Sequence, residues 1–228
     1  QLADSFQAVV SDMFTGRPQP GAIEIPIDLQ YANTKKVAIE LPSDNIFEAD
    51  PSVISRVADK IKEASKRIFV VGGGVISSEA TQELCELAEQ LDAPVLTTVD
   101  GRGVLPEDHR LCMGNYYNSA GIYSAIQDAD LTIAIGTKFA VGVDGQFHEQ
   151  TPPGELIQID IDGNMIGRTH KAAIGVLSDA KSALNQLKPL LSDLSQNDSQ
   201  FNEALFQARE GVQTAMRARL GKDWPQVM

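Results

Sequence analysis

The chain of 228 residues has little of what the common catalytic sites require. Its two cysteines, Cys85 and Cys112, stand 27 positions apart, which fits neither a disulfide framework nor a zinc pattern. A reducing cytoplasm is therefore the expected location. The three histidines share no metal-binding spacing with one another or with a cysteine; they are His109, His148 and His170. Since a Gly-x-Ser-x-Gly elbow and a P-loop are also missing, the sequence indicates a binding site without a catalytic constellation.

Long apolar runs and positive charge are scarce as well. No apolar run approaches the length of about 18 residues that a membrane-spanning helix needs, so we expect no membrane contact. No basic stretch followed by an apolar core opens the chain, so no signal peptide is expected. The net charge is −12, and an acidic surface repels phosphate backbones, which argues against nucleic acid as the partner. With 43% hydrophobic residues the chain can bury a real core, which excludes wholesale disorder.

Short apolar runs alternate with helical patterns through the middle of the chain. Strands are expected at 67–71, 94–97, 111–113, 131–135, 156–159 and 173–176. Asp50 followed by Pro51 predicts an N-cap and the first residue of a helix. Ser77 and Ser78 are expected to cap the next helix, and further helices are expected at 123–129 and 178–190. Strands that alternate with helices predict an α/β fold: a doubly wound, six-stranded parallel sheet with helices on both faces.

The two ends of the chain lack this alternation. Residues 2–13 predict an amphipathic helix and 22–25 a short strand, which together cannot form a core of their own and would dock on something else. Residues 31–50 show no clear period and are expected to be a linker. The polar stretch 192–199 is expected to be a second linker, after which another helix begins near Phe201.

Three glycines at 72–74, directly after the strand at 67–71, are the strongest local signal for a ligand. Glycines let the backbone approach a ligand closely, and the start of the following helix offers N–H groups to a phosphate. The dinucleotide pattern Gly-x-Gly-x-x-Gly is only partly met, because Ser77 takes the third position and the acidic Asp100 lies 26 residues after Gly74. A tight turn without a ligand is the alternative, and both readings stay open.

A second glycine, Gly136, ends the strand at 131–135. Ligands of doubly wound sheets bind at the carboxyl ends of strands beside the switch in strand order, so the two glycine turns would face each other across a crevice if their strands are neighbours. Lys138 is then a candidate for phosphate, or a solvated lysine. Asp160 is a candidate for ribose hydroxyls, or a strand-end cap, whereas Asp179 is better explained as an acid favoured by the helix dipole.

Several blocks of the sequence resemble thiamine diphosphate enzymes. Residues 17–28, RPQPGAIEIPID, resemble the stretch that closes the first domain of these enzymes. The blocks that resemble the central domain of the acetolactate synthase and 2-oxo acid decarboxylase family follow in the family's order: 71–74, 94–103, 106–109, 128–131, 135–139, 159–162 and 178–180. The order of these motifs makes the resemblance specific.

The resemblance implies a domain organisation. Residues 1–30 would be the C-terminal end of the pyrimidine-binding domain, 31–50 a linker, 51–191 the central domain, and 192–228 a linker with the start of the diphosphate-binding domain. The central domain would be Rossmann-like, of the DHS-like NAD/FAD-binding type. Thiamine diphosphate and Mg²⁺ would be held by the other two domains, which are the expected partners together with further copies in a dimer or tetramer.

The resemblance also implies the chemistry of the complete enzyme. The thiamine ylid attacks a 2-oxo acid, CO₂ leaves, and the carbanion is protonated or added to an acceptor. The Gly-Asp-Gly motif of the metal site is not in this chain, so we expect 1–228 alone to be inactive.

Some members of the family bind FAD or an ADP-like ligand in the central domain. The resemblance carries the contacts onto Gly73, Gly74, Thr98, Val99, Gly136, Thr137, Lys138, Asp160, Ile161, Asp179 and Ala180. Flavin-binding synthases continue with Phe-Asp-Asp-Arg-Val after the second glycine turn, where 139–143 read Phe-Ala-Val-Gly-Val here. The loss of the acidic pair and the arginine favours a structural domain that binds a nucleotide weakly. The alternative is a self-standing flavin- or nicotinamide-binding module.

Overall fold

The computed structural model describes residues 2–33, 47–115, 120–139, 151–194 and 196–221. The chain divides into two compact units, Gln1–Ile46 and Phe47–Met228, which are described separately. The first unit contains α1 (Leu2–Phe14) and the short α2 (Ile27–Gln30). Between these helices the chain passes against α1, since a Cβ added to Gly21 would lie 2.6 Å from Val9.

The sequence prediction of a strand at 22–25 is wrong. These residues lie in the described part of the chain and are not part of any strand. A strand requires hydrogen-bonding groups of a neighbouring strand, and the described residues of the first unit provide none. The alternating pattern of 22–25 therefore belongs to a mostly exposed segment, in which only Ile23 is partly buried, and not to a ladder.

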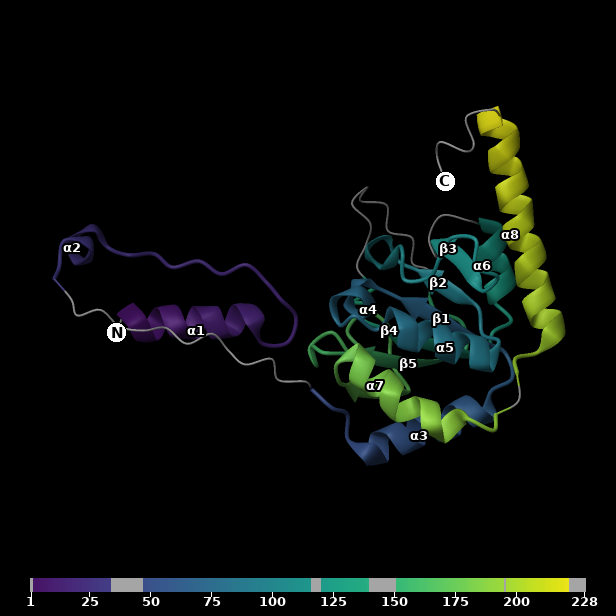
Figure 1. The fold of residues 1–228 in the computed structure, drawn as a ribbon, viewed down its shortest axis with the longest axis horizontal. Coiled ribbons are helices and arrows are strands. Elements are labelled where there is room, and N and C mark those ends of the chain that lie inside the picture. The colour runs from purple at the N-terminus through teal and green to yellow at the C-terminus, as the bar shows by residue number, and fades with distance from the viewer. Residues whose placement is uncertain (1, 34–46, 116–119, 140–150, 195, 222–228) are drawn as a thin grey trace. The chain divides into compact units, whose positions relative to one another are not determined.

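The second unit is built on six parallel strands in the order β3-β2-β1-β4-β5-β6 (Figure 1). The strands are β1 (Arg67–Val71), β2 (Val95–Thr97), β3 (Cys112–Asn115), β4 (Leu131–Ile135), β5 (Glu155–Asp160) and β6 (Ile174–Leu177). β1 and β4 are paired along their whole length, from Arg67 opposite Leu131 to Val71 opposite Ile135. The strand order reverses between these two strands, which confirms the doubly wound parallel sheet.

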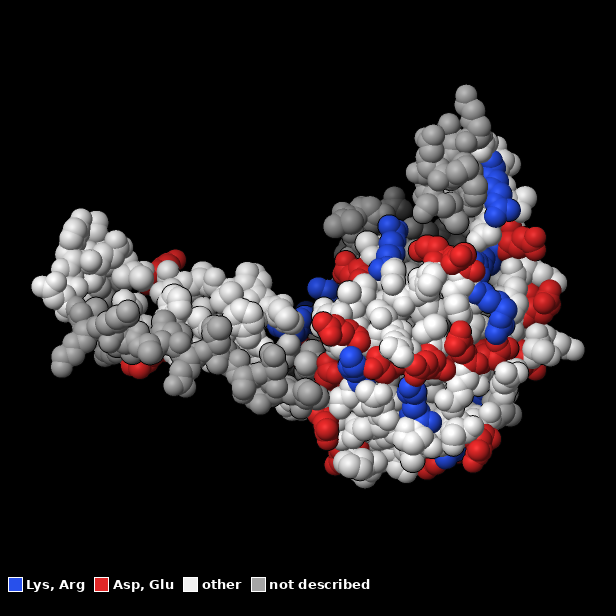
Figure 2. All heavy atoms as spheres, viewed as in Figure 1, with Lys and Arg blue, Asp and Glu red and all other residues white. Residues whose placement is uncertain are grey.

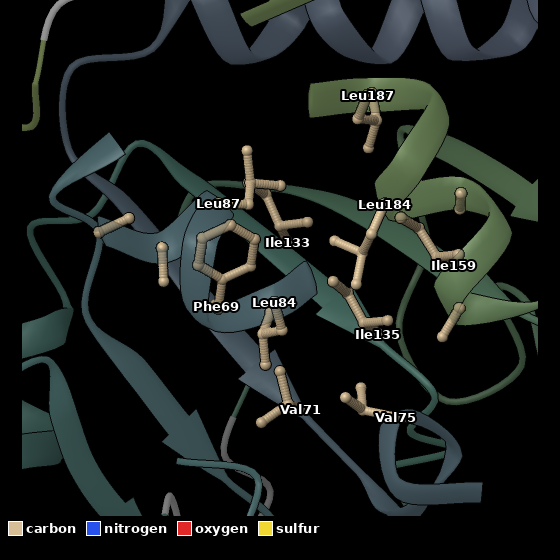
Figure 3. Close-up of a cluster of buried hydrophobic side chains, with 14 of the residues drawn as sticks. Phe69, Val71, Val75, Leu84, Leu87, Ile133, Ile135, Ile159, Leu184 and Leu187 are labelled. Atoms are coloured by element: carbon tan, nitrogen blue, oxygen red, sulfur yellow. The ribbon is translucent and has the colours of Figure 1, made fainter. Parts of the chain in front are cut away.

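Helices cover both faces of the sheet. Phe69 and Val71 of β1 face the larger core, which is covered by α3 (Pro51–Glu63), α5 (Thr81–Leu91) and α7 (Ala180–Leu187) (Figure 3). Ile68 and Val70 point the opposite way, as strand geometry requires, toward α6 (Ala120–Ile126) and α8 (Ser199–Leu220). Each such buried side chain contributes about 1.5–3 kcal/mol, so both layers stabilise the sheet.

The helix ends follow the sequence prediction only in part. Asp50 caps α3 as expected, because its carboxylate accepts a hydrogen bond from Ser52 N at 2.8 Å. Ser77 and Ser78 do not cap α5. The chain winds a short helix, α4 (Gly73–Ser77), immediately after the glycines, so the serines lie at its C-terminal end and Ala80 precedes α5.

Two other helices differ in extent from the predictions. The helix expected at 123–129 begins three residues earlier, and Ala129 already lies between α6 and β4. The helix expected at 178–190 consists of α7 and the 3₁₀ turn η2 (Lys188–Leu191).

A buried asparagine joins the polar stretch before α8 to the first residue of β1. Asn197 accepts a hydrogen bond from Arg67 N at 2.8 Å and donates one to Arg67 O at 2.9 Å, in the way that a neighbouring strand would. Its amide also donates to Asn202 of α8, which in turn donates to Asp92 O at 2.6 Å. The start of α8 is therefore fixed to the sheet and to the end of α5. The domain boundary expected after residue 191 stays a prediction about a longer protein.

We predict that Asn197→Ala lowers the free energy of unfolding by about 3 kcal/mol, because it leaves the buried amide and carbonyl of Arg67 without partners. Urea unfolding followed by circular dichroism measures this change. The matched control is Gln207→Ala on the exposed face of α8, where the loss should stay within about 0.5 kcal/mol. A loss below about 1 kcal/mol for Asn197→Ala would contradict the role assigned to this side chain.

Candidate functional site

The residues proposed to contact a nucleotide all lie at one edge of the sheet, because the strands are parallel and each position follows the carboxyl end of a strand. Gly73 and Gly74 begin α4 after β1, Thr98 and Val99 follow β2, and Gly136, Thr137 and Lys138 follow β4. Asp160 ends β5 and Ile161 follows it, while Asp179 and Ala180 stand at the start of α7 after β6. The fold therefore brings positions as far apart in the chain as Gly73 and Ala180 to a common edge.

The two glycine turns are in direct backbone contact. Gly74 N donates to Gly136 O at 3.1 Å, and Gly72 N donates to Ile135 O at 3.0 Å. A Cβ added to Gly74 would lie 2.6 Å from Gly136 Cα, and one added to Gly136 would lie 2.6 Å from Gly74 Cα. The glycines are thus required by the approach of one backbone to another, and the Gly74 amide already has an acceptor.

The chain after β2 closes on the same turns. Thr98 N donates to Val71 O at 2.8 Å, and a Cβ on Gly101 would lie 2.3 Å from that same oxygen. Asp100, in the 3₁₀ turn η1 (Val99–Gly101), lies beside Gly73, whose added Cβ would be 3.2 Å from Asp100 Cβ. An exposed carboxylate next to the glycine turn lowers the attraction of this edge for a phosphate.

The two aspartates proposed for ribose or capping roles both bind backbone amides. Asp160 is 2% exposed, and its carboxylate accepts from Asp162 N at 3.0 Å. Asp179 is the N-cap of α7 and accepts from Ser182 N at 3.0 Å. Its own amide donates to Phe47 O at 2.8 Å. These contacts favour the structural alternative for both carboxylates.

Gln158 is a residue of this edge that sequence reasoning missed. Its side chain is buried within β5 and donates to Thr137 O at 3.1 Å and to Met165 O at 3.2 Å. It also accepts from Gly167 N at 2.8 Å, so one amide ties the turn after β4 to the loop after β5. The signal was present, since a glutamine in the middle of an otherwise apolar strand needs buried hydrogen-bond partners.

The segment that departs from the flavin-binding pattern is described only at its first residue. Ala140, Val141, Gly142 and Val143 lie outside the described residues. Phe139 is buried and has a positive φ of 49°, and its ring meets the edge of His170 at a centroid distance of 5.0 Å. Burial lowers the pKa of His170, so this ring is mostly neutral near pH 7.

Charges of both signs are interleaved on the face of the second unit in Figure 2, with acidic side chains in a broad band across it. Among the described residues, no helix is long and apolar enough to span a membrane.

The fold and the carboxyl edge of its sheet define a doubly wound α/β domain, and comparison with known proteins identifies the family to which this domain belongs. Residues 54–187 match the model of the thiamine pyrophosphate enzyme central domain. The chain is 34% identical to the acetolactate synthase large subunit of Corynebacterium glutamicum over 82% of its length, and 30% identical to a glyoxylate carboligase of Escherichia coli O157:H7 over 80%. Benzoylformate decarboxylase from Polynucleobacter necessarius has the same fold, with a TM-score of 0.63 at 24% identity over 86% of this chain and 36% of that one.

The chain therefore belongs to the thiamine pyrophosphate enzyme family and contains its central domain. This confirms the fold and family predictions, and the alternative of a self-standing flavin or nicotinamide module is not favoured. The chain spans about a third of the length of the curated relatives it matches, 30% of the C. glutamicum protein and 32% of the E. coli one. Binding at the proposed nucleotide contacts stays a prediction.

We predict that Gly74→Ala destabilises the chain by about 2–3 kcal/mol, because the new methyl group meets the backbone of Gly136. Gly211→Ala on α8 is the matched control, since a Cβ there has no neighbour within 4 Å, and it should stabilise the chain by about 1 kcal/mol. Thermal and urea unfolding check both values. Unchanged stability in Gly74→Ala would mean that the glycine is not required by backbone packing.

Proposed function

We propose that the chain is the central, non-catalytic part of a longer enzyme that uses thiamine diphosphate to decarboxylate a 2-oxo acid or to join it to an acceptor. The observation that carries the proposal is the 34% identity to an acetolactate synthase large subunit over 82% of the chain. The similarity to a glyoxylate carboligase and to the fold of benzoylformate decarboxylase supports the same reaction class. Most of the residues that would select the 2-oxo acid lie outside this chain.

The residues of the chain do not fit thiamine diphosphate and Mg²⁺. The Gly-Asp-Gly motif is missing from the sequence. At the carboxyl edge of the sheet Asp160 and Asp179 accept hydrogen bonds from Asp162 N and Ser182 N, and so are already engaged. We therefore assign both groups to the neighbouring domains, and the central domain contributes a rigid scaffold.

Residues 1–30 are proposed to be the C-terminal end of the pyrimidine-binding domain, and 192–228 a linker with the start of the diphosphate-binding domain. In the first unit no residue of α1 is buried, and Leu2, Phe6 and Phe14 expose 46%, 43% and 60% of their surface. An apolar helix face of this kind is covered in a stable protein, which supports docking of α1 on the rest of the pyrimidine-binding domain. A cytoplasmic dimer or tetramer is the proposed form of the complete enzyme.

A nucleotide such as FAD or an ADP-like ligand is proposed to bind weakly at the carboxyl edge, at the positions from Gly73 to Ala180 named above. The amide of Gly74 is already bonded to Gly136, and Asp100 lies beside the turn. The net charge of −12 repels anions. The absence of the family's arginine from 139–143 removes one charge-assisted hydrogen bond. This loss lowers the affinity for the nucleotide by about tenfold or more.

Activity tests the function directly. The chain of residues 1–228 with thiamine diphosphate, Mg²⁺ and pyruvate should release no CO₂ above a buffer control. The product of the complete gene, assayed in the same way, should release CO₂ and form either an aldehyde or an α-hydroxy ketone, in which the hydroxyl carbon is bonded to the carbonyl carbon. CO₂ release by 1–228 alone, or none by the complete gene product with any of pyruvate, glyoxylate and benzoylformate, would contradict the proposal.

Titration calorimetry with FAD and with ADP tests the nucleotide site. We expect dissociation constants weaker than about 10 µM for both, and Lys138→Met should weaken any measurable ADP binding several-fold. Arg102→Met, a control that removes a nearby positive charge outside the proposed contacts, should leave it unchanged. FAD binding tighter than about 10 µM would show that the edge is a true cofactor site.

A further inference from the structure

Three side chains of metal-ligating type converge between α5 and the loop before β3. Cys85 and Glu89 are four residues apart on α5 and share one face of the helix, and His109 approaches from the loop. The thiol, a carboxylate oxygen and a ring nitrogen all lie within 4.8 Å of one another. His109 Nε2 lies 3.1 Å from Glu89 Oε1. The glutamate is exposed and the other two are half-buried, so an ion from solvent can reach the group.

The loop that carries His109 is held in place by contacts that do not depend on an ion. Arg209 of α8 donates to His109 O at 2.8 Å and to Glu107 O at 2.8 Å. Arg110 pairs with Asp92 at the end of α5 at 2.5 Å. The two elements that bear the three side chains are therefore fixed relative to one another, as a preorganised site requires.

We propose that Cys85, Glu89 and His109 bind one divalent cation of the zinc type, with water as the fourth ligand. Zn²⁺ takes sulfur, nitrogen and oxygen ligands at about 2.0–2.3 Å in tetrahedral geometry, so its ligand atoms stand roughly 3.3–3.8 Å apart. Small side-chain rotations bring the three atoms to that spacing. A thiolate with an imidazole selects zinc-like ions over Mg²⁺ and Ca²⁺, which prefer oxygen ligands alone. The inference does not rest on the proposed function.

Binding changes the protonation of two groups. The thiol of Cys85 loses its proton to solvent. The proton that His109 Nε2 directs toward Glu89 in the ion-free chain moves to Nδ1. In the ion-free chain Nδ1 accepts a bond from Leu111 N at 3.2 Å, and this bond is lost on binding. Losing the bond from Leu111 N weakens the affinity for the ion by about fivefold. With only three protein ligands as well, we expect a dissociation constant on the order of 1–10 µM, weaker than that of a four-ligand structural zinc site.

Cobalt titration of the reduced chain, residues 1–228, tests the site. Co²⁺ should bind one per chain and give a near-ultraviolet thiolate-to-cobalt charge-transfer band, and Zn²⁺ should displace it. Cys85→Ser should abolish the band, and His109→Gln should weaken Zn²⁺ binding by about 100-fold or more in competition with a chromophoric chelator. Glu89→Gln should weaken it by about tenfold.

The matched control is Glu86→Gln, since Glu86 is the neighbouring acid on α5 and pairs with Lys188. This variant should bind both metals as the parent chain does, and circular dichroism should show that every variant is folded. The buried Cys112 remains in all of them, so a band that survives Cys85→Ser would overturn the proposal. A parent Zn²⁺ dissociation constant weaker than about 100 µM would overturn it as well.

Discussion

Backbone contact between the turns after β1 and β4 determines the shape of the carboxyl edge of the sheet. Gly74 and Gly136 approach so closely that neither position has room for a Cβ, and the hydrogen bond from Gly74 N to Gly136 O joins the turns. The loop after β2 packs on Val71 O in the same way, and Gln158 extends the bonding to the loop after β5. The loops at the edge that a nucleotide would occupy are thus joined to one another by backbone and side-chain hydrogen bonds.

The opposite side of the domain is fixed by polar contacts of the chain that leaves the sheet. Asn197 bonds both backbone groups of Arg67, and Arg209 bonds the loop that carries His109. α8 is thereby held over the second face of the sheet, where Phe201 and Leu205 in its first two turns are buried. Beyond them no residue of α8 is buried.

The sheet could be predicted from the sequence because its central strands are buried on both faces and read as unbroken apolar runs. The bounds of β1 and β4 coincide with the predicted ones for that reason. The prediction of a strand at 22–25 was wrong, because alternation of apolar and polar residues cannot show whether a partner strand exists. The contact of Gly74 with Gly136, and the meeting of Cys85 with His109, depend on how distant segments pack. A glycine pattern suited to a ligand is equally suited to a neighbouring backbone, and only the fold distinguishes them.

Amide hydrogen exchange at Gly74 and Gly136 in the nucleotide-free chain tests most directly whether the glycine turns serve packing. Both amides donate to backbone oxygens, Gly74 to Gly136 O and Gly136 to Ile159 O. They should exchange as slowly as the amides of the central strands, and FAD or ADP should not slow them further. Fast exchange in the free chain that becomes slow when FAD or ADP is added would show that the turns are open and that a nucleotide completes them.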